Sequence, residues 1–202
     1  MKTYASLGLL AGFVLLSLPA YSAEAVAPAG GKAPTAKVTV QTEKNKEGVQ
    51  GVVLQAYVKA DIGTVWDIVT DSKKVKGLFP NILSIDFIKD ESSPNKNVVS
   101  KLWTYKLSSP LGTKVLQVET MNDKETYTAR WKRVSGDLKA FEGKWVLTSP
   151  AEYPGYTHIL YESFVEGGFF VPQFMTNRLN KKDTESMIVE LKKELQEKGG
   201  KD

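Results

Sequence analysis

The most constraining feature of this chain is a series of short strand-like runs followed by one long amphipathic segment. From residue 82 onward, six such runs are separated, with few exceptions, by clusters of Gly, Pro, Asn, Asp and Ser, the residues that tight turns need. The runs span residues 82–90, 97–108, 113–121, 125–134, 139–149 and 156–165. Regular, short spacing of this kind predicts an antiparallel meander.

The amphipathic segment, 172–197, predicts a long C-terminal helix. Its apolar side chains recur at helical spacing on one face, and Lys and Glu fill the other face. The apolar face consists of Phe174, Met175, Leu179, Met187, Ile188, Leu191 and Leu195. A helix of this kind must cover another apolar surface, and one face of the sheet is available.

Before the meander, the chain predicts further strand and two short helices. Residues 36–41 and 51–59 largely alternate apolar and polar positions around a charged turn at 44–48, which fits either a hairpin or one bent strand. Asp61 can cap a first short helix, and Asp71 can begin a second one. The fold class is therefore α+β, with an antiparallel sheet of six to seven strands, two short helices after the first strand, and a long closing helix.

The first 23 residues predict a cleavable secretory signal peptide. Lys2 supplies a positive start, 7–18 is an apolar run of twelve residues, and small residues follow. Cleavage after Ser22 and cleavage after Ala25 fit almost equally well. A membrane-spanning helix is disfavoured because it needs about 20 apolar residues. The Ala-, Pro- and Gly-rich stretch 24–35 is expected to be a flexible leader.

Composition narrows the compartment and the classes of partner. The chain has no cysteine, so it carries neither a disulfide framework nor a lipid-attachable thiol, and with the signal peptide a bacterial periplasm fits best. Net charge is +4, but 24 of the 27 basic residues are Lys, interspersed with Asp and Glu rather than gathered in a basic stripe. We therefore expect no nucleic-acid partner, a single domain at 36–197, and a disordered tail at 198–202.

Several motifs resemble the START-like (SRPBCC) helix-grip superfamily, in the branch that groups polyketide cyclase/dehydrase proteins with coenzyme Q-binding START-domain proteins. The matching segments are 58–66 (VKADIGTVW), 68–71, the turn 79–82, Trp131, 136–139 (GDLK), 141–147 (FEGKWVL), 168–172 (GFFVP) and 177–179. The resemblance implies a curved antiparallel sheet that grips the C-terminal helix, with a hydrophobic tunnel between them for a lipid-like or polycyclic ligand. Binding proteins, lipid carriers and some cyclases share such a fold, so the fold alone does not select a function.

Strand alternation predicts an inner face rich in aromatic residues. The residues expected there are Trp103, Tyr105, Tyr127, Trp131, Phe141, Trp145 and Tyr161. These rings either make the core or line a gap beneath the helix, where their hydroxyl and N–H groups would serve as polar handles. With Phe170, Phe174, Met175 and Leu179 near the start of the long helix, they are the candidate ligand-binding residues.

The segment 167–172 joins the last strand to the long helix and contains two glycines, two phenylalanines and a proline. Because glycine frees the backbone, the segment fits a mobile portal at the mouth of a pocket, opposite the loop at 78–80. An ordinary strand-to-helix connection with buried phenylalanines fits equally well.

Catalytic machinery is hard to find. His158, the only histidine, falls mid-strand and by alternation faces away from the inner face. With one histidine and no cysteine, neither a transition-metal site nor a cysteine nucleophile is expected, and we expect no cofactor. Helix capping and surface solvation explain the carboxylates considered, Asp67, Asp71 and Asp137.

These patterns favour an exported protein that binds or carries a hydrophobic small molecule, such as a lipid, a quinone or a polycyclic compound, rather than an enzyme. Transient membrane contact is compatible with that role. A cyclase- or dehydratase-like enzyme and an interaction module with a collapsed cavity stay open as alternatives. A cavity above about 300 Å³ with an ionisable group would favour the enzyme, a purely apolar cavity the carrier, and no cavity the module. The sequence does not decide the oligomeric state.

Overall fold

The computed structural model describes residues 38–93, 95–109, 111–167 and 173–199, and from residue 173 onward the side chains of 182–197 only. The chain first forms an antiparallel hairpin of β1 (Thr39–Lys44) and β2 (Gln50–Val58). Asn45 closes its turn: the backbone carbonyl accepts from Gly48 N at 3.0 Å, and the side-chain oxygen accepts from Val49 N at 2.8 Å. Of the two readings of this segment, the hairpin is therefore correct.

Two short helices follow, α1 (Ile62–Val69) and α2 (Ser72–Leu78). Each begins where the sequence predicts, because Asp61 and Asp71 are their N-caps. Each carboxylate accepts two backbone N–H groups of the first turn, the shorter bonds being 2.7 Å and 2.8 Å. Such caps satisfy donors that the start of a helix otherwise leaves unpaired.

All six strand-like runs of the predicted meander are strands, with ends that differ by a few residues. They are β3 (Ile82–Glu91), β4 (Val98–Leu107), β5 (Lys114–Asp123), β6 (Thr128–Gly136), β7 (Leu138–Thr148) and β8 (Thr157–Gly167). With the hairpin they form one eight-stranded antiparallel sheet in the order β1-β2-β8-β7-β6-β5-β4-β3. The sheet exceeds the predicted six to seven strands because the first segment supplies two, so the short helices follow the second strand.

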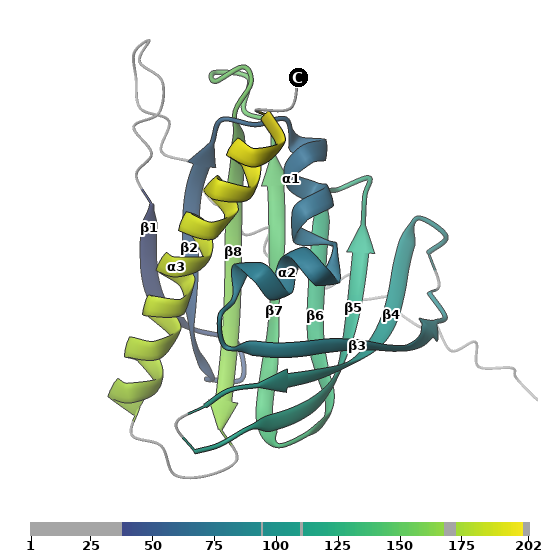
Figure 1. Cartoon of the computed structure of the whole chain (residues 1–202), viewed down its shortest axis with the longest axis vertical. Helices are drawn as coiled ribbons and strands as arrows, with labels where there is room; N and C mark the ends of the chain where they lie inside the picture. The colour runs from purple at the N-terminus through teal and green to yellow at the C-terminus, as the bar shows by residue number, and fades with distance from the viewer. Residues whose placement is uncertain (1–37, 94, 110, 168–172, 200–202) are drawn as a thin grey trace, which may run out of the picture. The chain divides into compact units, whose positions relative to one another are not determined.

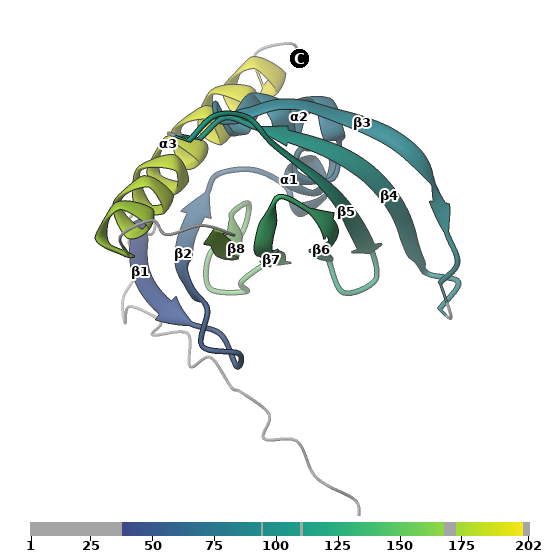
Figure 2. The ribbon, with the colours of Figure 1, turned by 90° about the horizontal axis from the view of Figure 1, so that it is seen from below.

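The sheet is strongly curved. Register shifts interrupt the β3–β4, β5–β6 and β7–β8 ladders, and such irregularities bend and twist the strands that carry them. Figure 2 shows β3 and β4 arching away from β6 and β7, so that the far end of the sheet returns toward α2 and α3. The concave face of the sheet and the three helices therefore enclose a common interior.

The closing helix, α3 (Gln173–Gly199), crosses this concave side (Figure 1) and contacts β1, β2 and α2. Met187, Ile188 and Leu191 on its predicted apolar face are at most 3% exposed, and Leu195 packs partly buried beside them. Burial of this face, rather than helix propensity, holds the helix in place. The helix-grip arrangement of the prediction is confirmed.

Two groups of buried side chains make the core. One lies beneath α1 and α3 and includes Leu54 and Ile159, and the other lies toward β4 and β5 and includes Leu116. Phe79 and Trp131 pack against both groups. The space that these two rings border is therefore the junction of the two halves of the core.

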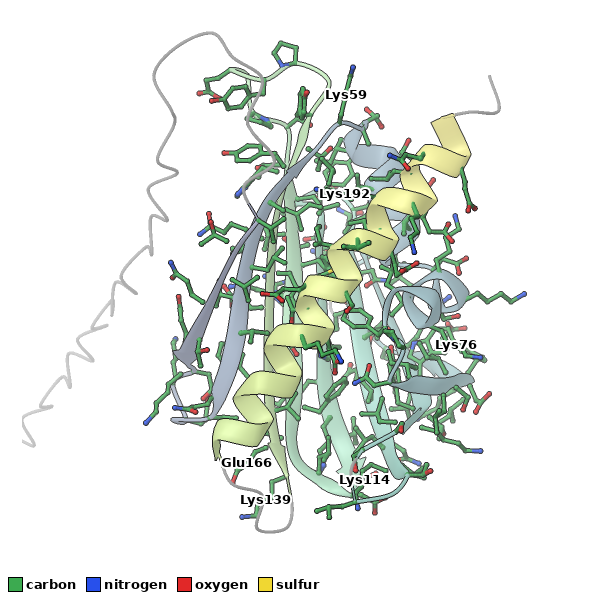
Figure 3. The ribbon with its side chains drawn as sticks, turned by 60° about the vertical axis from the view of Figure 1, so that its left-hand side comes forward. Lys59, Lys76, Lys114, Lys139, Glu166 and Lys192 are labelled. Atoms are coloured by element: carbon green, nitrogen blue, oxygen red, sulfur yellow. The ribbon has the colours of Figure 1, made fainter. Side chains whose placement is uncertain are left out.

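The surface carries its charge in dispersed form. Figure 3 shows Lys59, Lys76, Lys114 and Lys192 on separate parts of the fold. Lys139 and Glu166, also labelled there, form an ion pair at 3.5 Å where β7 and β8 meet. No helix within the described ranges is both long and apolar enough to cross a membrane.

Candidate ligand-binding site

A pocket of about 120 Å³ lies between the concave face of the sheet and the helices. Strands β2 to β8 and all three helices contribute lining residues. Its volume is close to that of a cavity of about 150 Å³ that admits benzene, and it is below the range of roughly 300–1,000 Å³ that is usual for drug-sized ligands. The pocket is thus large enough for one ring.

Six of the seven aromatic residues predicted on the inner face line this pocket. They are Trp103, Tyr105, Trp131, Phe141, Trp145 and Tyr161. Tyr161 is central: its ring centroid lies 5.6 Å from that of Trp131, in a stacked arrangement, and 4.5 Å from that of Trp145. Alternation along the strands therefore assigned the inner face correctly, while a role of these rings in binding stays a prediction.

Tyr127 is the exception, because it does not line the pocket. It precedes β6 in a turn and has a positive φ of 46°, so the alternation of the strand does not extend to it. Its ring instead meets Trp66 of α1 edge to face, with centroids 5.6 Å apart, and packs against the core. The prediction placed it correctly against the interior but not on the pocket.

The indole of Trp131 lies against Gly143, its cross-strand neighbour on β7. A Cβ atom built on Gly143 would lie 2.3 Å from Cζ2 of the indole and 2.1 Å from the backbone oxygen of Glu162. Real Cβ atoms do not approach other atoms so closely. Glycine at this position is therefore what lets the indole serve as a wall of the pocket.

The aromatic wall continues toward the edge strand. The indole nitrogen Nε1 of Trp103 donates to Thr120 Oγ1 at 3.0 Å, which fixes the ring across β4 and β5. Phe87 of β3 meets this ring edge to face at 5.4 Å, although 53% of Phe87 is exposed. The pocket therefore grades into an apolar surface at the rim of the sheet.

The remaining predicted binding residues cannot be placed in the pocket. Phe170 and the portal segment at 168–172 lie outside the described residues. Phe174, Met175 and Leu179 belong to the first turns of α3, and their side chains are likewise outside the described part of the chain. Their proposed contacts with a ligand stay predictions.

Asp183 is a lining residue that the sequence analysis missed. It lies half-buried on α3, and burial raises the pKa of its carboxyl, an effect that the nearby charge of Lys182 partly opposes. The signal was present in the sequence: Asp183 lies four residues before Met187 and eight before Leu191, within the apolar stripe. A carboxylate in the middle of such a stripe indicates a group directed at the covered interior.

Two buried tyrosines, Tyr161 and Tyr105, also line the pocket, and the charge of Asp183 acts on the hydroxyl of Tyr161. Burial raises the pKa of Tyr161. A hydrogen bond with Ser163 partly opposes this rise, and the charge of Asp183 adds a smaller rise. Burial alone raises the pKa of Tyr105. Both hydroxyls therefore stay protonated near neutral pH and can donate hydrogen bonds.

Two further polar atoms in lining residues are buried without a hydrogen-bond partner in the described structure. They are the indole Nε1 of Trp131 and the side-chain oxygen Oδ1 of Asn81. A buried donor or acceptor without a partner costs about 1–3 kcal/mol. The lining residues thus contain one donor and one acceptor that no described residue satisfies.

His158 lies on the opposite face of the sheet, as predicted, and does not line the pocket. It packs against Tyr57 with ring centroids 4.8 Å apart, and burial lowers its pKa. Asp71 caps α2, and Asp137 accepts from Val115 N at 2.8 Å, so each has a structural role. Among the described residues, no cluster of three or more acidic or histidine side chains could hold a metal ion.

Comparison of the sequence with family models and with curated proteins found no match. Solved structures do match. A START superfamily protein from Mycobacterium smegmatis is similar at a TM-score of 0.60 and 16% identity, over 73% of this chain and 97% of that chain. Human StAR-related lipid transfer protein 5 is similar at a TM-score of 0.61 and 12% identity, over 83% and 85% of the two chains.

The Zhui aromatase/cyclase from a Streptomyces species is similar at a TM-score of 0.53 and 10% identity, over 72% of this chain and 90% of that chain. The chain has the START-like helix-grip fold. At these identities the likeness is one of fold alone, and the named proteins include both a lipid transfer protein and a cyclase.

The motifs that suggested the START-like fold occupy defined places in it. Trp66 of the Val-Trp motif is buried in α1, at the core beneath α3. Gly143 and Trp145 of the strand motif lie on the concave face of β7, one under Trp131 and the other on the pocket. These three motif residues therefore belong to the pocket and its supports.

Proposed function

We propose that this protein binds a hydrophobic small molecule in the pocket between its sheet and α3, and that it does so outside the cytoplasm. The observation that carries the proposal is the aromatic-walled pocket, because a ligand there would leave water for apolar walls. The N-terminal pattern, with its apolar run 7–18, supports export. The START-like fold supports binding, since a lipid transfer protein shares it.

An enzyme of the cyclase or dehydratase kind is the second candidate, and Asp183 is the observation in its favour. Its half-buried carboxyl could act as an acid or base on a bound substrate. The pocket volume, however, is below the threshold of about 300 Å³ expected for such a site, while Asp183 makes the pocket less than purely apolar, so the pocket meets neither the enzyme criterion nor the carrier criterion in full. The pocket is also present rather than collapsed, so the interaction module has no observation in its favour.

Intrinsic fluorescence provides a direct test of binding, because Trp103, Trp131 and Trp145 line the pocket while Trp66 does not. Protein isolated from its native compartment would be analysed by mass spectrometry for a co-purified small molecule. The isolated compound, and a panel of quinones, fatty acids and small aromatics, would then be titrated while tryptophan emission is recorded. We expect saturable changes in emission and a mature N-terminus at Ala23 or Val26.

Two variants on β6 distinguish binding in the pocket from binding at the surface. Ala129→Leu adds volume inside the pocket and is expected to weaken binding, whereas Val134→Leu changes a residue that is 53% exposed and should leave binding intact. Circular dichroism would confirm that both variants fold. If no compound co-purifies and none of the panel changes the emission, the proposed function is wrong.

A further inference from the structure

Two charged residues line the described part of the pocket. They are Asp183 of α3 and Arg130 of β6. Arg130 is exposed, and its cross-strand neighbour Lys144 pairs with Glu162 on the outer face at 3.1 Å. Alternation along β6 places Trp131 on the inner face. The neighbouring Arg130 is therefore directed to the outer face, where Lys144 and Glu162 lie. Among the residues whose side chains the structure describes, an anionic group inside the pocket would therefore face the carboxyl of Asp183 with no inward-facing cation beside it.

The pocket also has polar groups that an entirely apolar ligand would leave without partners. The hydroxyl of Tyr105 lies in a side chain that is 8% exposed, and it makes no hydrogen bond within the described structure. Trp131 Nε1 is an orphaned donor and Asn81 Oδ1 an orphaned acceptor. Both atoms belong to residues that line the pocket.

A hydroxyl group is the simplest ligand group that meets these conditions, because it both donates and accepts and carries no charge. The pocket volume is comparable with that of one ring, and the stacked indole and phenol rings of the wall suit an aromatic ligand. We propose that the pocket holds a neutral monocyclic compound of the phenol class, with its hydroxyl directed at the polar side chains of the lining, among them Asp183, Tyr105 and Trp131. This inference rests on the proposed function, and it names the ligand class of the same site.

Phenol and toluene are matched in size and shape and differ at the hydroxyl, so they are the central pair of probes. Their dissociation constants would be measured by NMR titration of the ¹⁵N-labelled protein, with the indole N–H signals assigned by single Trp→Phe variants. Benzoate tests a carboxylate on the same ring, and 1-dodecanol tests a long apolar chain. We expect phenol to bind about 3- to 10-fold more tightly than toluene, the difference that one added hydrogen bond makes. We also expect phenol to shift the Trp131 indole signal more than toluene does.

Three variants test the hydrogen-bonding group. Tyr105→Phe removes one hydroxyl and keeps the ring, and Asp183→Leu removes the carboxyl, so each should reduce the preference for phenol over toluene. Tyr57→Phe is the matched control, because it removes a tyrosine hydroxyl from the outer face and should leave the preference unchanged. Tyr105→Phe is nearly isosteric and keeps the test decisive if Asp183→Leu does not fold.

The outcomes separate this inference from the proposed function. Equal binding of phenol and toluene, tighter binding of benzoate or 1-dodecanol than of phenol, or a preference that survives both pocket variants would overturn the phenol assignment while leaving a binding function in place. Failure of every probe, including 1-dodecanol, to bind would count against the proposed function itself.

Discussion

At the scale of single residues, Gly143 is the position on which the pocket wall most depends. Its strand neighbours leave no room for a side chain, since Trp131 lies on one side and the backbone of β8 on the other. Glycine in a strand normally weakens it. Here the small size of Gly143 leaves room for the indole of Trp131 to contact the sheet directly, so that this ring forms a wall of the pocket.

Gly143→Ala is therefore expected to destabilise the protein by about 1–3 kcal/mol, because the new methyl group has to displace the indole and the neighbouring strand. The free energy of unfolding would be measured by urea denaturation. Gly77→Ala is the control: its Cβ would meet nothing within 4 Å, and in α2 alanine should stabilise by about 0.5–1 kcal/mol. Equal stability of the Gly143 variant and the unchanged protein would contradict the account of the pocket wall.

Residue-level features were predictable from the sequence where they depend on local geometry. The inner face of β4, β7 and β8 follows from alternation alone, so Tyr105, Trp145 and Tyr161 were assigned correctly. Tyr127 was not, because a positive φ just before β6 changes the direction of its side chain. Asp183 was not predicted, because a charged residue in a helix rich in Lys and Glu is ordinarily expected to face solvent.

At the scale of elements, α3 depends on a narrow line of contacts. Leu191 is completely buried, whereas Val189, two residues earlier, is 51% exposed. The helix is rich in Lys and Glu outside this line, so its own sequence supplies little apolar burial except where it meets the sheet and α2. Docking of α3 is therefore sensitive to single buried side chains.

Leu191→Ala should lower the free energy of unfolding by about 2–5 kcal/mol, the usual loss for a buried leucine that leaves a cavity. Val189→Ala on the same helix should change it by less than about 0.5 kcal/mol. Chemical denaturation followed by circular dichroism measures both. A small effect at Leu191 would mean that α3 does not pack on the sheet as described.

Element boundaries were largely predictable, because turn residues and capping carboxylates mark them in the sequence. The start of both short helices follows from Asp61 and Asp71. The choice between a hairpin and a bent strand at residues 36–59 was not predictable, since both give the same alternation. It depends on Asn45, whose side chain and backbone close the turn.

At the scale of the whole molecule, the stability of the folded domain is expected not to depend on the predicted leader, residues 24–35. The described structure begins at Val38, and Val38 and Val40 already pack against the core. A chain that begins at Ala36 should therefore melt within about 1 °C of one that begins at Val26, a shift that corresponds to less than ~0.5 kcal/mol for a domain of this size. Differential scanning calorimetry of the two chains measures this. A loss of several degrees would place the domain boundary earlier than the sequence predicts.

The class of fold was predictable, but the capacity of its interior was not. Strand count, helix positions and the START-like resemblance together led to the helix-grip arrangement. The volume of the pocket depends on how six aromatic rings divide the space above the sheet, which no local pattern specifies. A single-ring pocket and a lipid-sized tunnel would look alike in the sequence.

The strand order also has a consequence for the time course of folding. Because β2 pairs with β8, the sheet is completed only when the last strand of the chain is available to the second. Pairings between segments so distant in sequence form slowly, since the intervening chain must first be ordered. In a freshly synthesised chain the edge of β2 therefore waits for its partner until β8 has been made.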